Sequence, residues 1–211
     1  MIINVNKPSG WTSFDVVKKI RGIVNEKKVG HAGTLDPFAT GVLILGTGSD
    51  TKKLSNIASS NKTYIADLTL GIETDTLDCD GNIVSKNKTP ELSQKLVKDV
   101  LSKFKGVNKQ IPPMYSAKKV NGIRLYKLAR QNKTVERDPV DINILDIQLI
   151  KFKSSIITFK VKCSKGTYVR VLGVDIAKKL GTVGHLSSLI RTSIGSYNID
   201  ESKSIEEISA L

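Results

Sequence analysis

Two neighbouring segments restrict the fold of this 211-residue chain more than any other feature. Residues 142–152 and 156–163 alternate apolar with polar side chains, and only a short connection separates them. Such alternation is typical of β-strands with one buried face, and a short connection joins strands that pair with each other. The sequence therefore predicts two paired strands in this part of the chain.

Shorter strand and helix patterns are mixed through the rest of the chain. Strands are predicted at residues 2–4, 42–45 and 63–70. Helices are predicted after Thr12 or Ser13, at residues 52–58, between Leu92 and Phe104, at residues 169–180 and at residues 205–211. Because strands and helices do not alternate regularly, this order favours an α+β domain over a doubly wound sheet. At this length we expect a single domain, residues 1–211.

The charge of the chain is strongly positive. A net charge of +13 and a pI near 9.7 indicate a polyanionic partner, because Lys and Arg displace condensed counterions from phosphates. Most of these cations are Lys, and the chain is also rich in Ile and Asn. A genome of biased base composition would produce the same excess. Charge alone leaves both explanations open.

The residue inventory argues against several classes of protein. Cys79 and Cys163 are isolated, and the two histidines are His31 and His185, so neither a disulfide framework nor a zinc site is indicated. Phosphate-binding and dinucleotide-binding motifs are absent from the sequence, and we expect neither a metal nor a cofactor. Apolar runs fall short of the ~20 residues that span a bilayer, and the first residues lack a signal-peptide pattern. We therefore expect a cytoplasmic protein.

The strongest chemical signal lies in residues 29–43. Three glycines and a proline surround a single carboxylate, Asp36, and an apolar strand follows at once. Glycine allows close approach of the backbone to a ligand, and Pro37 fixes the chain just after the acid. An aspartate in this setting suits a nucleophile or a general base. It equally suits a turn residue that caps local backbone groups.

Five blocks, in order, resemble the TruB family of pseudouridine synthases. They lie at residues 7–13, 30–41, 62–64, 113–117 and 163–170, and the likeness extends from Asn6 to Arg191. The resemblance implies the α+β pseudouridine synthase fold, a mixed and mainly antiparallel sheet flanked by helices and loops. It further implies isomerisation of one uridine in the T arm of tRNA, at position 55 of the TΨC loop, without a cofactor.

The resemblance also assigns two catalytic residues. Asp36 matches the essential aspartate of the family. Arg170 matches the arginine that pairs with this aspartate and holds it ionised and oriented. Without the surrounding block, Arg170 would be interpreted as a solvated residue at the start of a helix.

Four further residues match the substrate-binding side chains of the family. His31 matches a wedge that enters the T loop, and Tyr64 matches a tyrosine that stacks on the flipped base. Tyr168 matches a second pocket tyrosine, and Leu189 matches an apolar pocket wall. Each has a structural alternative: a loop histidine bonded to local backbone, or ordinary core residues on strands.

Residues of about 113–141 occupy the place of an RNA-contacting insertion of the family. A short helix is expected around Tyr126. The basic residues of this segment are Lys118, Lys119, Arg124, Lys127, Arg130, Lys133 and Arg137. We expect most of them to contact phosphates, which position RNA without reading its sequence. A solvated charged face would give the same pattern.

Two features depart from the family pattern. Ile190 precedes Arg191 where the family often has two arginines, so we expect one backbone contact fewer. The sequence stops at Leu211, and we expect no C-terminal RNA-binding module of the PUA type.

The expected partner is tRNA, bound through its T-arm stem-loop. We expect a monomer that needs no membrane and no obligatory protein partner. Two alternatives stay open: a guide-RNA-dependent relative resembling dyskerin, and a non-catalytic chaperone that folds tRNA through the same basic surface.

Overall fold

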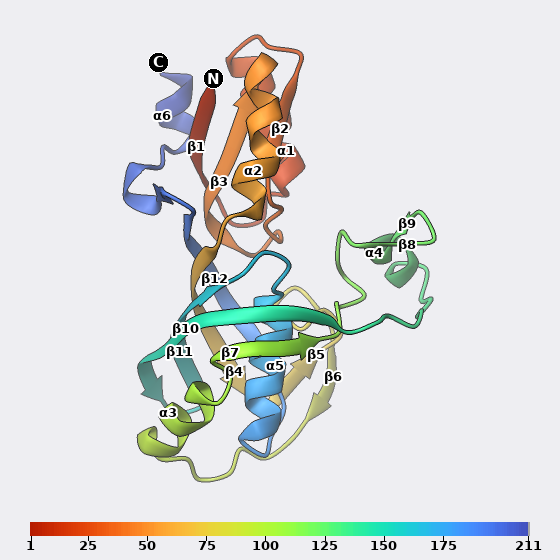
Figure 1. The fold of residues 1–211 in the computed structure, drawn as a ribbon. Helices are drawn as coiled ribbons and strands as arrows, with labels where there is room; N and C mark the ends of the chain where they lie inside the picture. The colour runs from red at the N-terminus through yellow and green to blue at the C-terminus, as the bar shows by residue number, and fades with distance from the viewer. Residues whose placement is uncertain (211) are drawn as a thin grey trace. The chain divides into compact units, whose positions relative to one another are not determined.

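The computed structural model describes residues 1–210, which form two compact units. Unit 1 comprises Met1–Ile65 together with the described residues from Leu189 onward, and unit 2 comprises Ala66–Ser188. Strands β4 (Lys62–Leu70) and β12 (Gly184–Ile194) contribute residues to both units (Figure 1). The expectation of a single domain stays a prediction.

Strand β3 (Thr40–Thr47) is the centre of unit 1. It pairs antiparallel with β1 (Ile2–Lys7) and β2 (Val29–Ala32), and parallel with β12. The short strand β13 (Tyr197–Asn198) pairs antiparallel with the end of β12. Because both faces of β3 are covered, it reads as a continuous apolar run rather than an alternating one.

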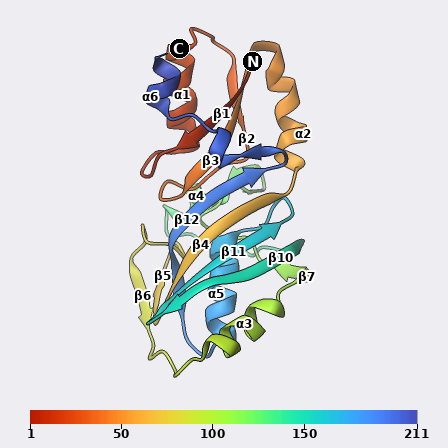
Figure 2. The ribbon, with the colours of Figure 1, turned by 90° about the vertical axis from the view of Figure 1, so that its left-hand side faces the viewer.

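Helices cover both faces of β3 (Figure 2). Leu43 and Leu45 pack against α1 (Ser13–Ile23) and α6 (Ile205–Ser209). Val42 and Ile44 point the other way, toward α2 (Leu54–Ser59), which follows the 3₁₀ helix η1 (Gly48–Lys53). Successive side chains of a strand point to opposite faces, so one apolar run supplies both small cores of unit 1.

A capping box begins helix α1. The Thr12 side chain accepts a hydrogen bond from the Asp15 backbone N–H, and the Asp15 carboxylate accepts bonds from Thr12 in return. These hydrogen bonds from Thr12 lower the pKa of Asp15. The reciprocal bonds satisfy amide groups that the helix itself leaves unpaired. They fix the start of α1 directly after residues 7–11, a segment that donates hydrogen bonds to the candidate site.

Unit 2 contains the two strands that the sequence predicts most clearly. β10 (Val140–Lys153) and β11 (Ile156–Cys163) are antiparallel, and β7 (Gly106–Gln110) pairs with the other edge of β10. The strand order in this unit is β12-β4-β11-β10-β7. Helices α3 (Gln94–Ser102) and α5 (Val169–Lys179) pack beside each other against this sheet (Figure 2).

Two small hairpins extend from unit 2. The first joins β5 (Ile72–Thr74) to β6 (Ile83–Lys86). The second lies between β7 and β10 and consists of β8 (Lys119–Val120), β9 (Ile123–Arg124) and helix α4 (Leu125–Ala129) (Figure 1). This second segment, between Gln110 and Val140, coincides with the insertion expected at residues of about 113–141.

The observed elements confirm the α+β class and the mainly antiparallel sheet flanked by helices. The predicted helix at residues 52–58 is instead the end of η1 followed by α2. The sequence did not predict strands β2, β7 and β12, or the short strands β5, β6, β8, β9 and β13. Along β12 the buried positions include an arginine and change phase between Leu186 and Leu189, which hides the period-two pattern. None of the helices in the described part of the chain is long and apolar enough to cross a membrane.

The close pairing of β3 with β12 yields a first prediction. Gly41 has a φ of +100°, and a Cβ added there would collide with the backbone carbonyl of Arg191. Gly41→Ala should therefore lower the free energy of unfolding by about 1–3 kcal/mol in equilibrium urea denaturation. The matched control is Gly22→Ala, because an added Cβ on this helical glycine meets open space. It should raise the free energy of unfolding by about 0.5–1 kcal/mol. Equal midpoints for the two variants would contradict the pairing.

Candidate active site

Asp36 lies on the connection between β2 and β3. The two strands are antiparallel, with Ala32 opposite Ile44, so residues 33–39 form the loop of a hairpin. Gly33 opens this loop with a φ of +83°, and the Ala39 N–H donates to the Asp36 carbonyl at 3.2 Å. Asp36 itself is half-buried, whereas its neighbour Leu35 is buried. Asp36 therefore lies on a loop whose apolar residues Leu35, Phe38 and Ala39 are buried.

Residues 7–10 hold one side of this loop through the carbonyl of Pro37. The Lys7 ammonium, which is fully buried, donates to this carbonyl at 3.1 Å. The same ammonium donates to the carbonyls of Pro8 and Trp11 at 2.8 and 2.6 Å. The Gly10 N–H donates to the Pro37 carbonyl as well, at 2.9 Å. One carbonyl next to Asp36 thus receives two donors from the N-terminal segment.

Ser13 forms two hydrogen bonds with the backbone of Leu35, the residue that precedes Asp36. Its buried hydroxyl accepts a hydrogen bond from the Leu35 N–H at 2.9 Å and donates to the Leu35 carbonyl at 3.2 Å. Ser13 is the first residue of α1, whose position the capping box fixes. The start of this helix therefore determines where the backbone enters Asp36.

Arg191, on β12, holds the loop from the other side. Its Nε donates to the Val42 carbonyl at 2.7 Å, and its Nη2 donates to the Gly33 carbonyl at 3.0 Å. Its Nη1 lies 3.5 Å from the Thr34 carbonyl. Sequence analysis missed both Lys7 and Arg191, because a single Lys or Arg in a basic chain is ordinarily a surface residue.

The other candidate residues of unit 1 lie on strands near this loop. His31 is half-buried on β2, opposite Leu45, and so is a strand residue rather than a loop residue. Tyr64 and Leu189 are 8% and 6% exposed, on the adjacent strands β4 and β12. Unit 1 therefore holds Asp36, His31, Tyr64 and Leu189. Their roles stay predictions.

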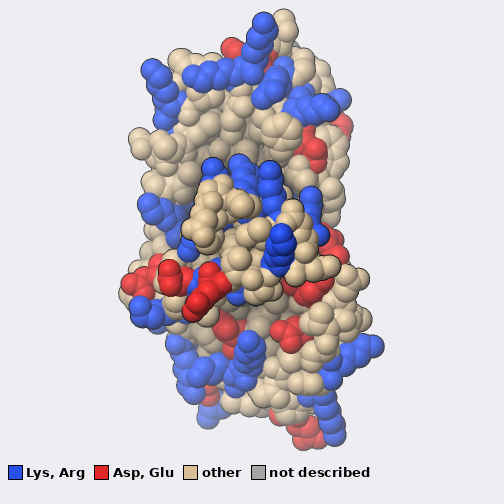
Figure 3. Space-filling model, turned by 90° about the vertical axis from the view of Figure 1, so that its right-hand side faces the viewer, with Lys and Arg blue, Asp and Glu red and all other residues tan. Residues whose placement is uncertain are grey.

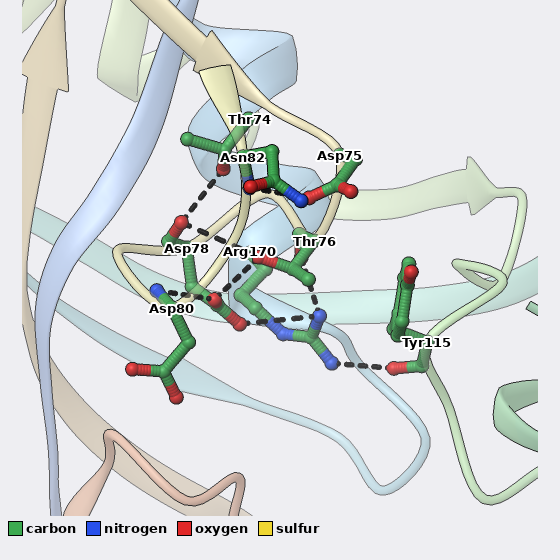
Figure 4. A network of polar contacts seen from close by, with 8 residues as sticks. All are labelled: Thr74, Asp75, Thr76, Asp78, Asp80, Asn82, Tyr115 and Arg170. Carbon is green, nitrogen blue, oxygen red and sulfur yellow. Dashed lines mark hydrogen bonds and ion pairs between the residues drawn. The ribbon is translucent and has the colours of Figure 1, made fainter. Parts of the chain in front are cut away.

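In unit 2, Arg170 occupies the first turn of α5, as predicted, and is 3% exposed. Its Nη1 donates to the Thr76 carbonyl at 2.6 Å and lies 3.4 Å from the Asp78 carboxylate. Its Nη2 donates to the Tyr115 carbonyl at 2.7 Å (Figure 4). A cation in the first turn opposes the helix dipole, and the buried carboxylate and carbonyls offset that cost. Its expected pairing with Asp36 joins residues of different units and stays a prediction.

The carboxylate of Asp78 is held by its own loop (Figure 4). The Thr76 hydroxyl and the Asp80 N–H donate to its Oδ1 at 2.6 and 3.1 Å. The Thr74 hydroxyl donates to the Asp78 carbonyl at 2.6 Å. Leu77 has a φ of +65°, in the left-handed region that a non-glycine residue adopts only when its surroundings hold it there. The loop is therefore shaped to present one buried carboxylate to Arg170.

Tyr168 is the residue that precedes α5. Its N–H donates to the Gln110 side-chain oxygen at 2.8 Å, and the Gln110 amide donates back to the Tyr168 carbonyl at 3.1 Å. Gln110 is 3% exposed, and Tyr168 is half-buried. Gln110 thus fixes the backbone of Tyr168 through two hydrogen bonds. Its role as a pocket residue stays a prediction.

The insertion is anchored by apolar residues and exposes basic ones. Leu125 is fully buried and Ala129 nearly so, and the Tyr126 N–H donates to the Ser116 carbonyl at 3.1 Å. The guanidinium of Arg130 lies 5.5 Å from the centre of the Tyr126 ring. The exposed basic residues are Lys119, Arg124, Lys127, Arg130 and Lys133. Figure 3 shows the face on which the insertion lies, where Lys and Arg side chains are widely spread.

The described residues offer little for a metal ion. His, Cys, Asp and Glu side chains nowhere in residues 1–210 form a group of three or more that could hold one. Cys79 is exposed and Cys163 is buried, and both are free thiols.

Comparison with known families and proteins points to one family. The model of the N-terminal domain of TruB family pseudouridylate synthases matches residues 21–169. The tRNA pseudouridine synthase B of Hydrogenovibrio crunogenus is 48% identical over 207 residues, which are 98% of this chain and 68% of that protein. The protein of the same name from Caldanaerobacter subterraneus subsp. tengcongensis is 48% identical over 208 residues, 98% of this chain and 73% of that protein.

Solved structures share the fold. A chain in the crystal structure of a Cbf5-Nop10-Gar1 complex superimposes with a TM-score of 0.79 at 27% identity, covering 99% of this chain and 53% of that chain. A chain in the archaeal box H/ACA sRNP Nop10-Cbf5 complex gives 0.73 at 24% identity, and this likeness concerns the fold alone. The present chain spans about half the length of these structural relatives.

The buried pair of Arg170 and Asp78 yields a prediction on stability. Asp78→Asn removes the carboxylate but leaves a guanidinium that is 3% exposed, and should cost about 3–5 kcal/mol of unfolding free energy. The control is Asp141→Asn, whose partner Lys109 is 3.5 Å away with both side chains mostly exposed. That change should stay below about 1 kcal/mol. Similar urea midpoints for the two variants would show that the buried pair is not held as described.

Proposed function

Because the chain belongs to the TruB family of pseudouridylate synthases, we propose that it isomerises one uridine in the T arm of tRNA. The target is position 55 of the TΨC loop, and Asp36 is the essential carboxylate. The observation that carries this proposal is the local geometry of Asp36. It is a half-buried acid on a loop whose backbone is hydrogen-bonded on both sides.

The reaction needs little beyond such a carboxylate. The glycosidic bond between N1 of the base and C1′ of the sugar breaks, the base turns, and C5 forms a bond to C1′. C5 then loses its proton, and N1 ends with one, so no atoms are added and no electrons are exchanged with a cofactor. A fixed carboxylate serves as a nucleophile or as a base in this sequence. A rigid loop suits this role, because misplacement of the acid lowers the rate steeply.

Arg170 and the substrate-binding residues complete the proposed site. The arginine pairs with Asp36 and favours its ionised form. The network around Arg170 supports this role, since its side chain is preoriented by Asp78 and by two carbonyls. The target base leaves its stack and is received by Tyr64, Tyr168 and Leu189, while His31 enters the T loop.

The basic insertion supplies phosphate contacts to the RNA. Five of its Lys and Arg side chains are exposed on a segment whose apolar residues are anchored. Contacts of this type fix the orientation of the hairpin, while the shape and unpaired bases of the loop select it. The proposal includes action as a monomer without an obligatory protein partner, in the cytoplasm where tRNA is modified.

Two other functions make different predictions for the isolated protein. A non-catalytic chaperone would bind tRNA and leave every uridine unchanged. A guide-RNA-dependent enzyme would be inactive until a guide and partner proteins were added. Incubation of the purified chain with an unmodified tRNA transcript distinguishes both from the proposed function.

We predict that carbodiimide labelling of this transcript reveals one new pseudouridine, at the uridine of the TΨC loop. A transcript with cytidine at that position is the control and should show no new signal. Modification at another position with position 55 intact would refute the proposed target. An unmodified transcript after saturating incubation would favour one of the two alternatives.

We predict that Asp36→Asn abolishes the reaction while tRNA affinity stays within a few-fold of the unchanged protein. The amide keeps the shape of the side chain but loses its charge and basicity. Asp200→Asn is a suitable control, because Asp200 is an exposed aspartate of the same unit. Single-turnover rates and filter-binding affinities measure the two effects separately. A rate above a hundredth of that of the unchanged protein would contradict the role of Asp36.

A further inference from the structure

Arg191 makes contacts that an ordinary strand residue does not make. It is 1% exposed, and all three nitrogens of its guanidinium face backbone carbonyls. The carbonyls belong to Gly33 and Thr34, which precede Asp36, and to Val42, which follows it. A single planar group therefore bridges the two ends of the loop that carries the acid.

We propose that Arg191 is a positioning residue of the reaction: its guanidinium holds the Asp36 loop in the conformation in which the carboxylate reaches the target nucleoside. This role presupposes the proposed function. It requires no contact between Arg191 and the RNA, and a residue buried to this extent offers none.

The chemistry of the guanidinium explains why an arginine occupies this position. Its N–H donors lie in one plane at fixed angles, so three acceptors can be held in a defined arrangement. A lysine ammonium would keep the charge but could not span carbonyls on both sides of the loop. An apolar residue would leave buried carbonyls without donors, and such groups are costly to bury.

The main chain of Arg191 holds the same loop a second time. Its backbone pairs with Gly41 in the parallel register of β12 and β3. The approach is so close that Gly41 has no room for a side chain. The main chain and the side chain of Arg191 thus contact residues 41–42 of β3, just after the loop, and the side chain alone reaches back to residues 33–34.

Arg191 also links Asp36 to the expected pocket wall. Leu189 lies two residues earlier on β12, and residues two apart on a strand point to the same face. A shift of β12 against β3 would therefore move Leu189 and the Asp36 loop relative to each other. Arg191 fixes this register through the backbone pair and the side-chain contacts.

The test separates positioning from folding and from RNA binding. Arg191→Lys is compared with the unchanged protein by single-turnover rate, tRNA Kd and thermal midpoint. We expect a rate about 10²-fold lower, as a displacement of roughly 1 Å at a reacting group can produce, with a Kd within threefold. The control is Ile205→Ala, a core residue of the same unit that packs against α1 and β1. It should lower the thermal midpoint but leave the rate within threefold.

Three outcomes would overturn this role. A folded Arg191→Lys protein with a rate within threefold of the unchanged protein would make Arg191 a purely structural residue. A weaker Kd with an unchanged rate would make it an RNA contact. An equal loss of rate in Ile205→Ala would make the effect one of general stability. If Arg191→Lys does not fold, Arg191→Gln is assayed at a temperature below its midpoint against the same criteria. If the unchanged protein itself has no activity, the proposed function is refuted. This result is distinct from a failure of the role of Arg191, which needs an active unchanged protein.

Discussion

The candidate site depends on buried cations that bind backbone carbonyls. Residues 33–39, which carry Asp36, lie outside helices and strands, so their carbonyls do not take part in a regular hydrogen-bond ladder. Lys7 donates to the loop carbonyl of Pro37, and Arg191 donates to the loop carbonyl of Gly33 and to that of Val42 on β3. Both cations are buried, so their hydrogen bonds operate where water does not compete. Side chains from β1 and β12 thereby hold a loop that has no repeating hydrogen bonds of its own.

Arg170 and Asp78 show the same principle applied to a side chain. The arginine is oriented by a carboxylate and two carbonyls, and the carboxylate is oriented by hydroxyl and amide donors from its own turn. Each polar group is thus held by a second layer of polar groups. Such networks are stable only when they are complete, because a partly satisfied buried charge is costly. Rigidity at Arg170 therefore comes from several short contacts rather than from one strong one.

The sequence predicted the elements whose pattern depends on one residue and its close neighbours. Strands β10 and β11 alternate visibly, and Thr12 with Val16, Val17 and Ile20 indicates helix α1. Strand β12 escaped prediction because its buried side chains include Arg191, which hydropathy assigns to the surface. Asp36 and Arg170 were predicted as catalytic residues through resemblance to a family, and their roles stay predictions. The sequence did not reveal that Lys7 and Arg191 hold the Asp36 loop. The contact between Lys7 and the Pro37 carbonyl joins residues 30 positions apart, and no local sequence pattern indicates it.

The supports of the Asp36 loop come from distant parts of the chain. Arg191 lies 158 residues from Gly33, and Lys7 lies 30 residues before Pro37. Contacts of such sequence separation form late, because long loops must close first. A chain emerging from the ribosome can complete the hairpin of β2 and β3 early, but its acid is not fixed until β12 has been synthesised. The loop therefore acquires its last support only after Arg191 has been synthesised, and shorter nascent chains carry an aspartate that is not yet held in place.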